Sequence, residues 1–161
     1  MSLKKEIGRN SSPAIRLAIV SMLLCGLLFP LAVTGFAQVL FPSQANGSIA
    51  QFSSGNSRAV GSYLIAQNFS QPFFFQPRNS SLSGSGVDPD ITLQDAYTQA
   101  RRISISTGIP QGAINDTITQ NVEGTFWTLG YPYVNVLRLN LAMIHNFQTV
   151  YEQKDPSLFV P

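Results

Sequence analysis

The chain has 161 residues, and only 11% of them are charged, where about a quarter is usual. Residues 1–16 carry four bases and one acid, residues 17–57 carry no charge, and residues 58–161 carry six bases and seven acids. This nearly neutral body excludes the usual basic nucleic-acid-binding protein, and the single cysteine, Cys25, excludes a disulfide within one chain.

The first predicted element is a charge-free, mostly apolar run of 25 residues from Leu17 to Phe41. At about 1.5 Å per residue, a helix of this length spans roughly 37 Å, which is enough to cross a hydrocarbon core of about 30 Å. Four bases precede the run, and basic residues stay on the cytoplasmic side. We therefore predict a cytoplasmic tail at 1–16, a transmembrane helix at 17–41 and an extracytoplasmic domain at 42–161.

A cleaved signal peptide is the alternative for this segment, because Gly35-Phe36-Ala37 is a small-x-small triplet that signal peptidases favour. The apolar run is longer than a typical signal core, however, and it continues past the triplet through Val39-Leu40-Phe41. The length therefore favours a retained anchor in the cell membrane.

The predicted anchor carries four small or polar residues at intervals of four: Gly26, Pro30, Thr34 and Gln38. This spacing places them along one face of a helix. Such a stripe lets another helix approach closely and form hydrogen bonds across the contact. The stripe predicts a partner helix in the membrane. A lone anchor that tolerates a few polar residues, with Gln38 reaching the outer interface, is the alternative.

The first part of the outer domain predicts turns and extended segments. Residues 43–48 and 52–57 are rich in turn-forming residues. Ser62–Phe69 and Pro72–Gln76 have the composition of extended segments. Residues 79–86 (NSSLSGSG) resemble a flexible connection.

Helices are predicted in the second part of the domain. Thr92 and Asp95 form a capping box, and Gly108 with Pro110 ends the helix that follows, whose buried face carries Ala96, Ala100, Ile103 and Thr107. A weaker helix is predicted at 113–122 and a turn at 130–132. Residues 134–143 fit a strand or a helix, and the length of the apolar pattern with Asn135 as N-cap favours a helix. The predicted fold class is therefore mixed α/β.

Catalytic motifs are absent from the sequence, which has no P-loop, no GxSxG elbow and no HExxH. His145 is the only histidine and lies in an apolar stretch, which favours a structural role over metal binding. Asp88-Pro-Asp90 favours a turn over a cation site. Arg78 is expected to pair with Asp88 inside the fold rather than with a partner's acid.

Five blocks, taken together, identify a family. VTGFAQVLFPSQANGS, GSYLIAQNF, FFFQPRNSS, SGSGVDPDIT and GYPYVNVLRLNLA occur in this order between about Leu31 and Ala142. They closely resemble the KdpC family, the small C subunit of Kdp-type potassium-transporting ATPases. The blocks single out motif residues to which no role is assigned: Gln44, Asn46, Gln67, Arg78, Asp88, Asn135 and Asn140. Relatives often have an insertion between the PRNSS and SGSG blocks, and His-Thr-Glu where this chain has Asn121-Val122-Glu123.

The resemblance implies an accessory subunit of an ATP-driven potassium uptake complex. The implied partners are a pore-like potassium-binding subunit, a P-type ATPase subunit, a very small membrane subunit and the lipid bilayer, and no nucleic acid. The family's C subunit is regarded as an assembly factor that raises the ATP affinity of the ATPase subunit. ATP is thus the one cofactor implied, and only through that subunit, because the predicted topology puts residues 42–161 outside. A membrane-anchored binding module that acts alone is the second interpretation, and an enzyme is the weakest.

Overall fold

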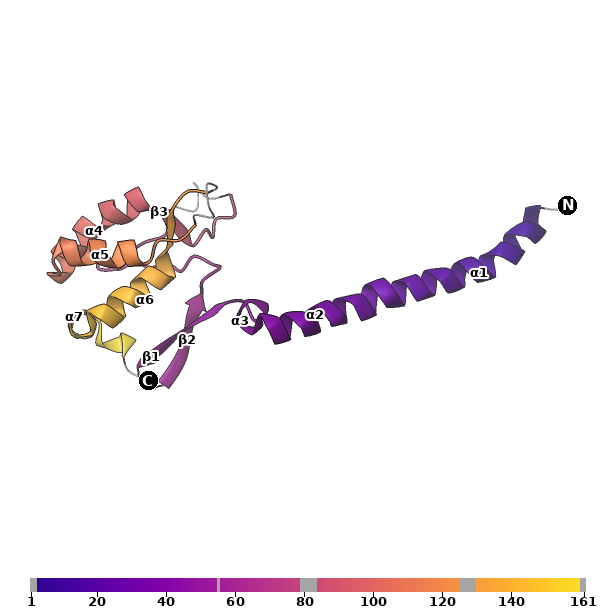
Figure 1. The fold of residues 1–161 in the computed structure, drawn as a ribbon, viewed down its shortest axis with the longest axis horizontal. Helices are drawn as coiled ribbons and strands as arrows, with labels where there is room; N and C mark the ends of the chain where they lie inside the picture. Colours follow the sequence, from indigo (N-terminus) through magenta and orange to yellow (C-terminus); the bar gives the residue numbers. More distant parts are fainter. Residues whose placement is uncertain (1–2, 55, 79–83, 125–129, 160–161) are drawn as a thin grey trace. The chain divides into compact units, whose positions relative to one another are not determined.

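The structure, a computed structural model, describes residues 3–54, 56–78, 84–124 and 130–159. The chain divides into two compact units, Met1–Gly47 and Ser48–Pro161. The first unit is helical, and the second combines helices with two small sheets (Figure 1). The mixed α/β class and the apolar N-terminal helix that the sequence predicts are therefore confirmed.

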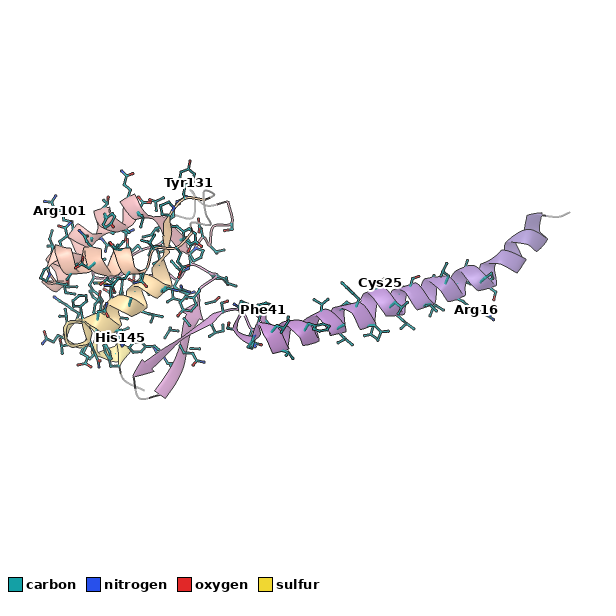
Figure 2. All side chains as sticks on the ribbon, viewed as in Figure 1. Arg16, Cys25, Phe41, Arg101, Tyr131 and His145 are labelled. Carbon is teal, nitrogen blue, oxygen red and sulfur yellow. The ribbon has the colours of Figure 1, made fainter. Side chains whose placement is uncertain are left out.

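One long helix dominates the first unit. Helix α1 (Leu3–Leu23), the π-helical turn η1 (Leu24–Leu28) and helix α2 (Phe29–Leu40) follow one another without a break. Within the described residues, Ser12–Leu40 is the one stretch long and apolar enough to cross a bilayer. Its side chains project outward on all sides, as Figure 2 shows around Cys25. A helix that is apolar all round is stable only in lipid or against partner helices.

The π-helical turn has a cause in the sequence, because Pro30 is the second residue after it. Proline has no N–H, so the carbonyl of Gly26 loses its usual donor four residues later. The N–H of Phe29 bonds to the carbonyl of Leu24, five residues back, which is the π-helical pattern. At Gly26 an added Cβ would meet nothing within 4 Å. The predicted stripe therefore begins where the helix is locally widened and has room for a close neighbour.

A short helical turn, α3 (Pro42–Ala45), ends the first unit. The second unit begins with an antiparallel hairpin of β1 (Ile49–Ser54) and β2 (Asn56–Ser62), with Phe52 opposite Arg58 and an irregularity after Ala50. The turn-rich stretch 52–57 lies where the chain passes from β1 to β2, and most of its residues belong to the two strands.

The second sheet pairs β3 (Asp90–Thr92) with β4 (Tyr133–Asn135) in antiparallel fashion. Helix α4 (Leu93–Thr107) leaves β3 at the predicted cap, where the Asp95 N–H donates to Thr92 Oγ1 at 3.2 Å. It ends at Gly108, whose φ of 79° is left-handed, a conformation that glycine adopts without strain. The predicted boundaries of this helix are confirmed.

Three further α-helices complete the domain: α5 (Gln111–Gln120), α6 (Val136–Asn146) and α7 (Gln148–Lys154), followed by the 3₁₀ turn η3 (Pro156–Leu158). Helix α5 is confirmed but starts and ends two residues before the predicted 113–122. Helix α6 is confirmed with Asn135 as its N-cap. Helix α4 packs against α5, and α5 against α6 (Figure 1).

The core lies where these helices meet, and the largest side chains with almost no exposure include Ile103, Ile114, Ile118, Leu139, Met143 and Tyr151. Phe73, Phe74 and Phe75 reach the same core from a segment without regular secondary structure. The predicted buried residues of α4 are confirmed for Ala96, Ala100 and Ile103, whereas Thr107 is half-buried.

The two segments predicted as extended do not form strands. Residue 62 ends β2, residues 63–65 form a turn, and residues 66–70 have no regular structure. Pro72–Gln76, the PFFFQ segment, begins in a turn and continues as irregular chain, although its three phenylalanines are buried. Of the predicted connection 79–86, residues 79–83 lie outside the described part of the chain, and residues 84–86 form a bend.

Candidate functional site

Side-chain amides take the place of a neighbouring strand along the PFFFQ segment. Asn140 of α6, with 1% of its surface exposed, accepts from the Phe75 N–H through Oδ1 at 2.8 Å and donates from Nδ2 to the Phe75 carbonyl at 2.9 Å. Gln99 of α4 does the same one residue later, with distances of 2.8 and 3.1 Å to the N–H and carbonyl of Gln76. Buried backbone groups must be paired, so these amides hold the segment in place without a β-ladder.

The remaining carbonyls of the PFFFQ segment are bound by two further side chains. Arg102 donates to the carbonyls of Pro72 and Phe74 at 2.6 and 2.9 Å, and Tyr151 donates its hydroxyl to the Phe73 carbonyl at 3.0 Å. Burial disfavours the charged form of a side chain, so it lowers the pKa of Arg102 and raises the pKa of Tyr151. In the hydrogen bonds described above, the side chain is the donor.

Sequence reasoning identified Asn140 as a motif residue but missed Gln99, Arg102 and Tyr151. The sequence did carry a signal for Gln99 and Arg102. They stand three residues apart on α4, beside the buried face formed by Ala96, Ala100 and Ile103. Residues three apart are neighbours on a helix; here Arg102 donates to Gln99 Oε1, and both contact the PFFFQ segment.

Asn135 connects three parts of the domain. Its Oδ1 caps α6 by accepting from the Arg138 N–H at 3.2 Å. Its Nδ2 donates to the Tyr63 carbonyl at 2.8 Å and to Asp90 Oδ1 at 3.0 Å. The motif residue Asn135 therefore joins the start of α6 to the end of the hairpin and to β3.

Several charged side chains lie near Asn135. Arg138 forms an ion pair with Glu123, and its guanidinium lies 5.1 Å from the centre of the Tyr63 ring, which is within cation–π range. Burial has the largest effect on the pKa of Asp90 and raises it; the hydrogen bond from Asn135 lowers it, the carboxylates of Asp88 and Glu123 raise it, and Arg138 lowers it. The net result is a raised pKa.

The predicted ion pair between Arg78 and Asp88 does not form, because Asp88 is used locally. Its Oδ1 accepts from the Asp90 N–H at 3.1 Å, which is the side-chain turn that Asp favours. Within the described residues the salt bridge is that of Arg138 with Glu123. The turn interpretation of Asp88-Pro-Asp90 agrees with this local bond, and Asp90 itself begins β3.

A stripe residue, Gln38, and a motif residue, Asn46, meet at the end of the long helix. Gln38 and Asn46 exchange amide hydrogen bonds of 3.4 and 3.3 Å, and Asn46 Nδ2 also donates to the Pro42 carbonyl at 2.7 Å. Gln44 accepts from the Ser43 hydroxyl at 2.7 Å. These bonds close the turn that ends the helix. Gln38, predicted to face a partner or the interface, thus has a partner within its own unit.

Gln67 and His145 complete the predicted residues. Gln67 donates to the Ile65 carbonyl at 3.0 Å and covers Gly61 so closely that an added Cβ there would lie 2.8 Å from Gln67 Cδ. His145 is exposed at the end of α6 (Figure 2), with Nδ1 3.5 Å from Asn146 Oδ1. The apolar residues around it in sequence face the core and His145 faces away, so the structure gives the expected structural role no buried contact.

Two cavities border the segment between the hairpin and the PFFFQ segment. One of about 290 Å³ has mostly apolar walls, and the other, of about 450 Å³, is more polar. Each is lined by a single arginine, Arg58 and Arg78 respectively. In the more polar cavity the side chains of Gln67, Asn68, Ser70 and Gln76 accompany its arginine.

Comparison with known proteins adds the deciding observation. The family model for the c chain of the K⁺-transporting ATPase, KdpC, matches residues 11–83 and 81–145. The chain belongs to the KdpC family. Its membership gives the chain an accessory role in a potassium transport complex, which is membrane-associated.

Individual KdpC relatives agree with this over most of their length. The potassium-transporting ATPase KdpC subunit of Myxococcus xanthus is 35% identical over 83% of this chain and 87% of its own. The corresponding subunits of Caldanaerobacter subterraneus and Gloeobacter violaceus are 30% and 32% identical, over 88% and 89% of this chain and 98% and 97% of theirs. The alignment with the Myxococcus subunit runs over 185 residues, more than the 161 of this chain, so it contains gaps here.

Proposed function

We propose that this chain supports the assembly of a potassium-transporting ATPase and raises the ATP affinity of its P-type ATPase subunit from a distance. The observation that carries the proposal is the family match, which covers the apolar helix as well as most of the second unit. The partners are a pore-like potassium-binding subunit, the P-type ATPase subunit and a very small membrane subunit.

The internal use of the motif residues supports an accessory role. Asn140 binds Phe75, Asn135 binds Tyr63 and Asp90, and Asn46 binds Gln38. Each polar group is occupied in holding one segment against another. A domain whose motif residues are used in this way presents a fixed surface to partners rather than a reactive group.

We place the N-terminus in the cytoplasm and the second unit outside, on the charge asymmetry of the sequence. Because Cys25 is the only cysteine, Cys25→Ser gives a background for single-cysteine labelling. A membrane-impermeant maleimide added to intact cells should label Ser70→Cys and spare Lys5→Cys. The reverse pattern would overturn the orientation, and with it the argument that ATP acts only through another subunit.

The helix stripe is proposed to contact a partner helix through Gly26, Pro30 and Thr34, since Gln38 is already paired with Asn46. Replacing both Gly26 and Thr34 with leucine adds bulk on that face and should reduce recovery of the ATPase subunit when the chain is purified. Phe36→Leu is the matched control, because position 36 lies about 200° around the helix from position 34. Equal recovery with all three chains would exclude this contact.

Purification of the native chain separates this proposal from that of a binding module that acts alone. The accessory subunit should bring a P-type ATPase with it from gently solubilised membranes. Isolation of the wild-type chain without an ATPase, under conditions that preserve other membrane complexes, would favour the module.

A further inference from the structure

The cavity of about 290 Å³ lies between the hairpin and α6, in the second unit. Phe52 and Val60 of the hairpin line it together with Leu141 and Ile144 of α6 and Leu158 of η3. Asn140 also lines it, but the Asn140 amide is already bound to both backbone groups of Phe75. Gln67, Asn68, Ser70 and Gln71 line another part of the wall. The cavity therefore offers a ligand mostly apolar contact, with a few uncharged polar groups.

Arg58 is the one charged side chain that lines this cavity. It stands directly opposite Phe52 in the hairpin, and residues opposite each other in an antiparallel pair point to the same face. Val60, which has no partner across the hairpin because of the irregularity after Ala50, also lines the cavity. Arg58 is exposed and forms no ion pair with another described residue. The cavity thus has mostly apolar walls, a few uncharged polar side chains and a single solvent-exposed cation.

We propose that this cavity binds a free fatty acid of medium chain length, with the alkyl chain inside and the carboxylate beside Arg58. A methylene group occupies about the volume of a water molecule, roughly 30 Å³, so the cavity accommodates a single chain of about ten carbons. A phospholipid with two long acyl chains does not fit this volume. A lipid bilayer can supply such a ligand, because the same chain carries a helix that is apolar enough to reside in lipid.

The direct test is photolabelling of the full chain in phosphatidylcholine nanodiscs. The probe is decanoate with a diazirine at the end of its alkyl chain, and the labelled peptides are identified by mass spectrometry. Labelling of α1 and α2 measures the probe dissolved in the bilayer and serves as the internal standard. We expect strong labelling of the α6 peptide that contains Leu141 and Ile144. Labelling confined to the apolar helix would overturn the proposal.

Two variants and a control test the recognition. Leu141→Trp fills the cavity and should lower α6 labelling about tenfold relative to the internal standard. Arg58→Gln, on an exposed strand position that leaves the fold intact, should lower it about two- to fivefold, the range of an exposed ion pair. Arg101→Gln removes an exposed arginine of α4 (Figure 2) that does not line the cavity, and should change nothing.

The head group is tested with the matching alcohol, a ten-carbon diazirine probe without charge. Arg58→Gln should leave labelling of α6 by the alcohol unchanged while it weakens labelling by the acid. An equal effect of Arg58→Gln on both probes, or no effect on the acid, would overturn the assignment of the carboxylate to Arg58. Because this variant does not depend on the stability of Leu141→Trp, the proposal stays falsifiable if the tryptophan variant does not fold.

Discussion

Replacing Asn140 with leucine should destabilise the second unit severely, although the two side chains have similar size. The change removes both hydrogen bonds to Phe75 and leaves a buried N–H and a buried carbonyl without partners. Each unsatisfied group costs about 1–3 kcal/mol, so the free energy of unfolding should fall by about 2–6 kcal/mol. Because a domain of this kind has about 5–15 kcal/mol in total, a large fraction of the stability depends on one amide.

Urea unfolding of the full chain in detergent, followed by circular dichroism, measures this loss. With a slope of about 2 kcal/mol per molar urea, the midpoint should fall by about 1–3 M. Asn146→Leu is the matched control, because Asn146 is exposed at the end of the same helix and such surface changes cost less than about 0.5 kcal/mol. Equal midpoints for the two variants would refute the argument that side-chain amides replace a β-ladder along the PFFFQ segment.

Three further predictions concern the domain and the helix end. Burial and two neighbouring carboxylates raise the pKa of Asp90 above its ordinary 3.8, so the native state binds this proton more tightly than the unfolded state does. The resulting stability is full below about pH 3.8 and is lost as pH rises through the native pKa. Asp90→Asn should therefore raise the melting temperature at pH 7 but not at pH 3. A difference in melting temperature between wild type and variant that stays the same from pH 3 to pH 7 would contradict this prediction. Gly108→Ala should destabilise by about 1–2 kcal/mol because Gly108 has a left-handed φ, whereas Gly112→Ala within α5 should stabilise by about 0.5–1 kcal/mol; changes of the same sign in thermal melts would count against the helix cap. Gln38→Leu should leave the Asn46 side chain with only its bond to the Pro42 carbonyl and speed hydrogen exchange of the Asn46 and Gly47 amides, and unaltered exchange would show that the amide pair does not hold the helix end.

The accuracy of the sequence predictions depended on how local the deciding interactions are. Helix α4 was predicted to the residue because Thr92 and Gly108 act on backbone within their own turn. The predicted Arg78–Asp88 ion pair was wrong because here too a local interaction decides. Asp88 accepts from an N–H two residues away, and a search for opposite charges overlooks such a backbone donor.

The PFFFQ segment was misread because its partners are distant in sequence. Three phenylalanines between prolines resemble a buried strand, and a strand would have needed a neighbouring strand. Here the partners are side chains 23 residues away at Gln99 and 65 residues away at Asn140. The family motif brought Asn140 to attention, but its role depends on a contact between α6 and the PFFFQ segment that no local pattern encodes. The cavity beside Arg58 is likewise formed only by the fold.

The dependence of ATP hydrolysis on ATP concentration, measured on the purified potassium-transporting complex with and without this chain, tests the central claim most directly. The account predicts that omission of the chain raises the ATP concentration needed for half-maximal potassium-stimulated hydrolysis. Adding back the full chain should restore it, and the chain alone should hydrolyse no ATP. Identical ATP dependence in the two preparations would contradict the proposed function.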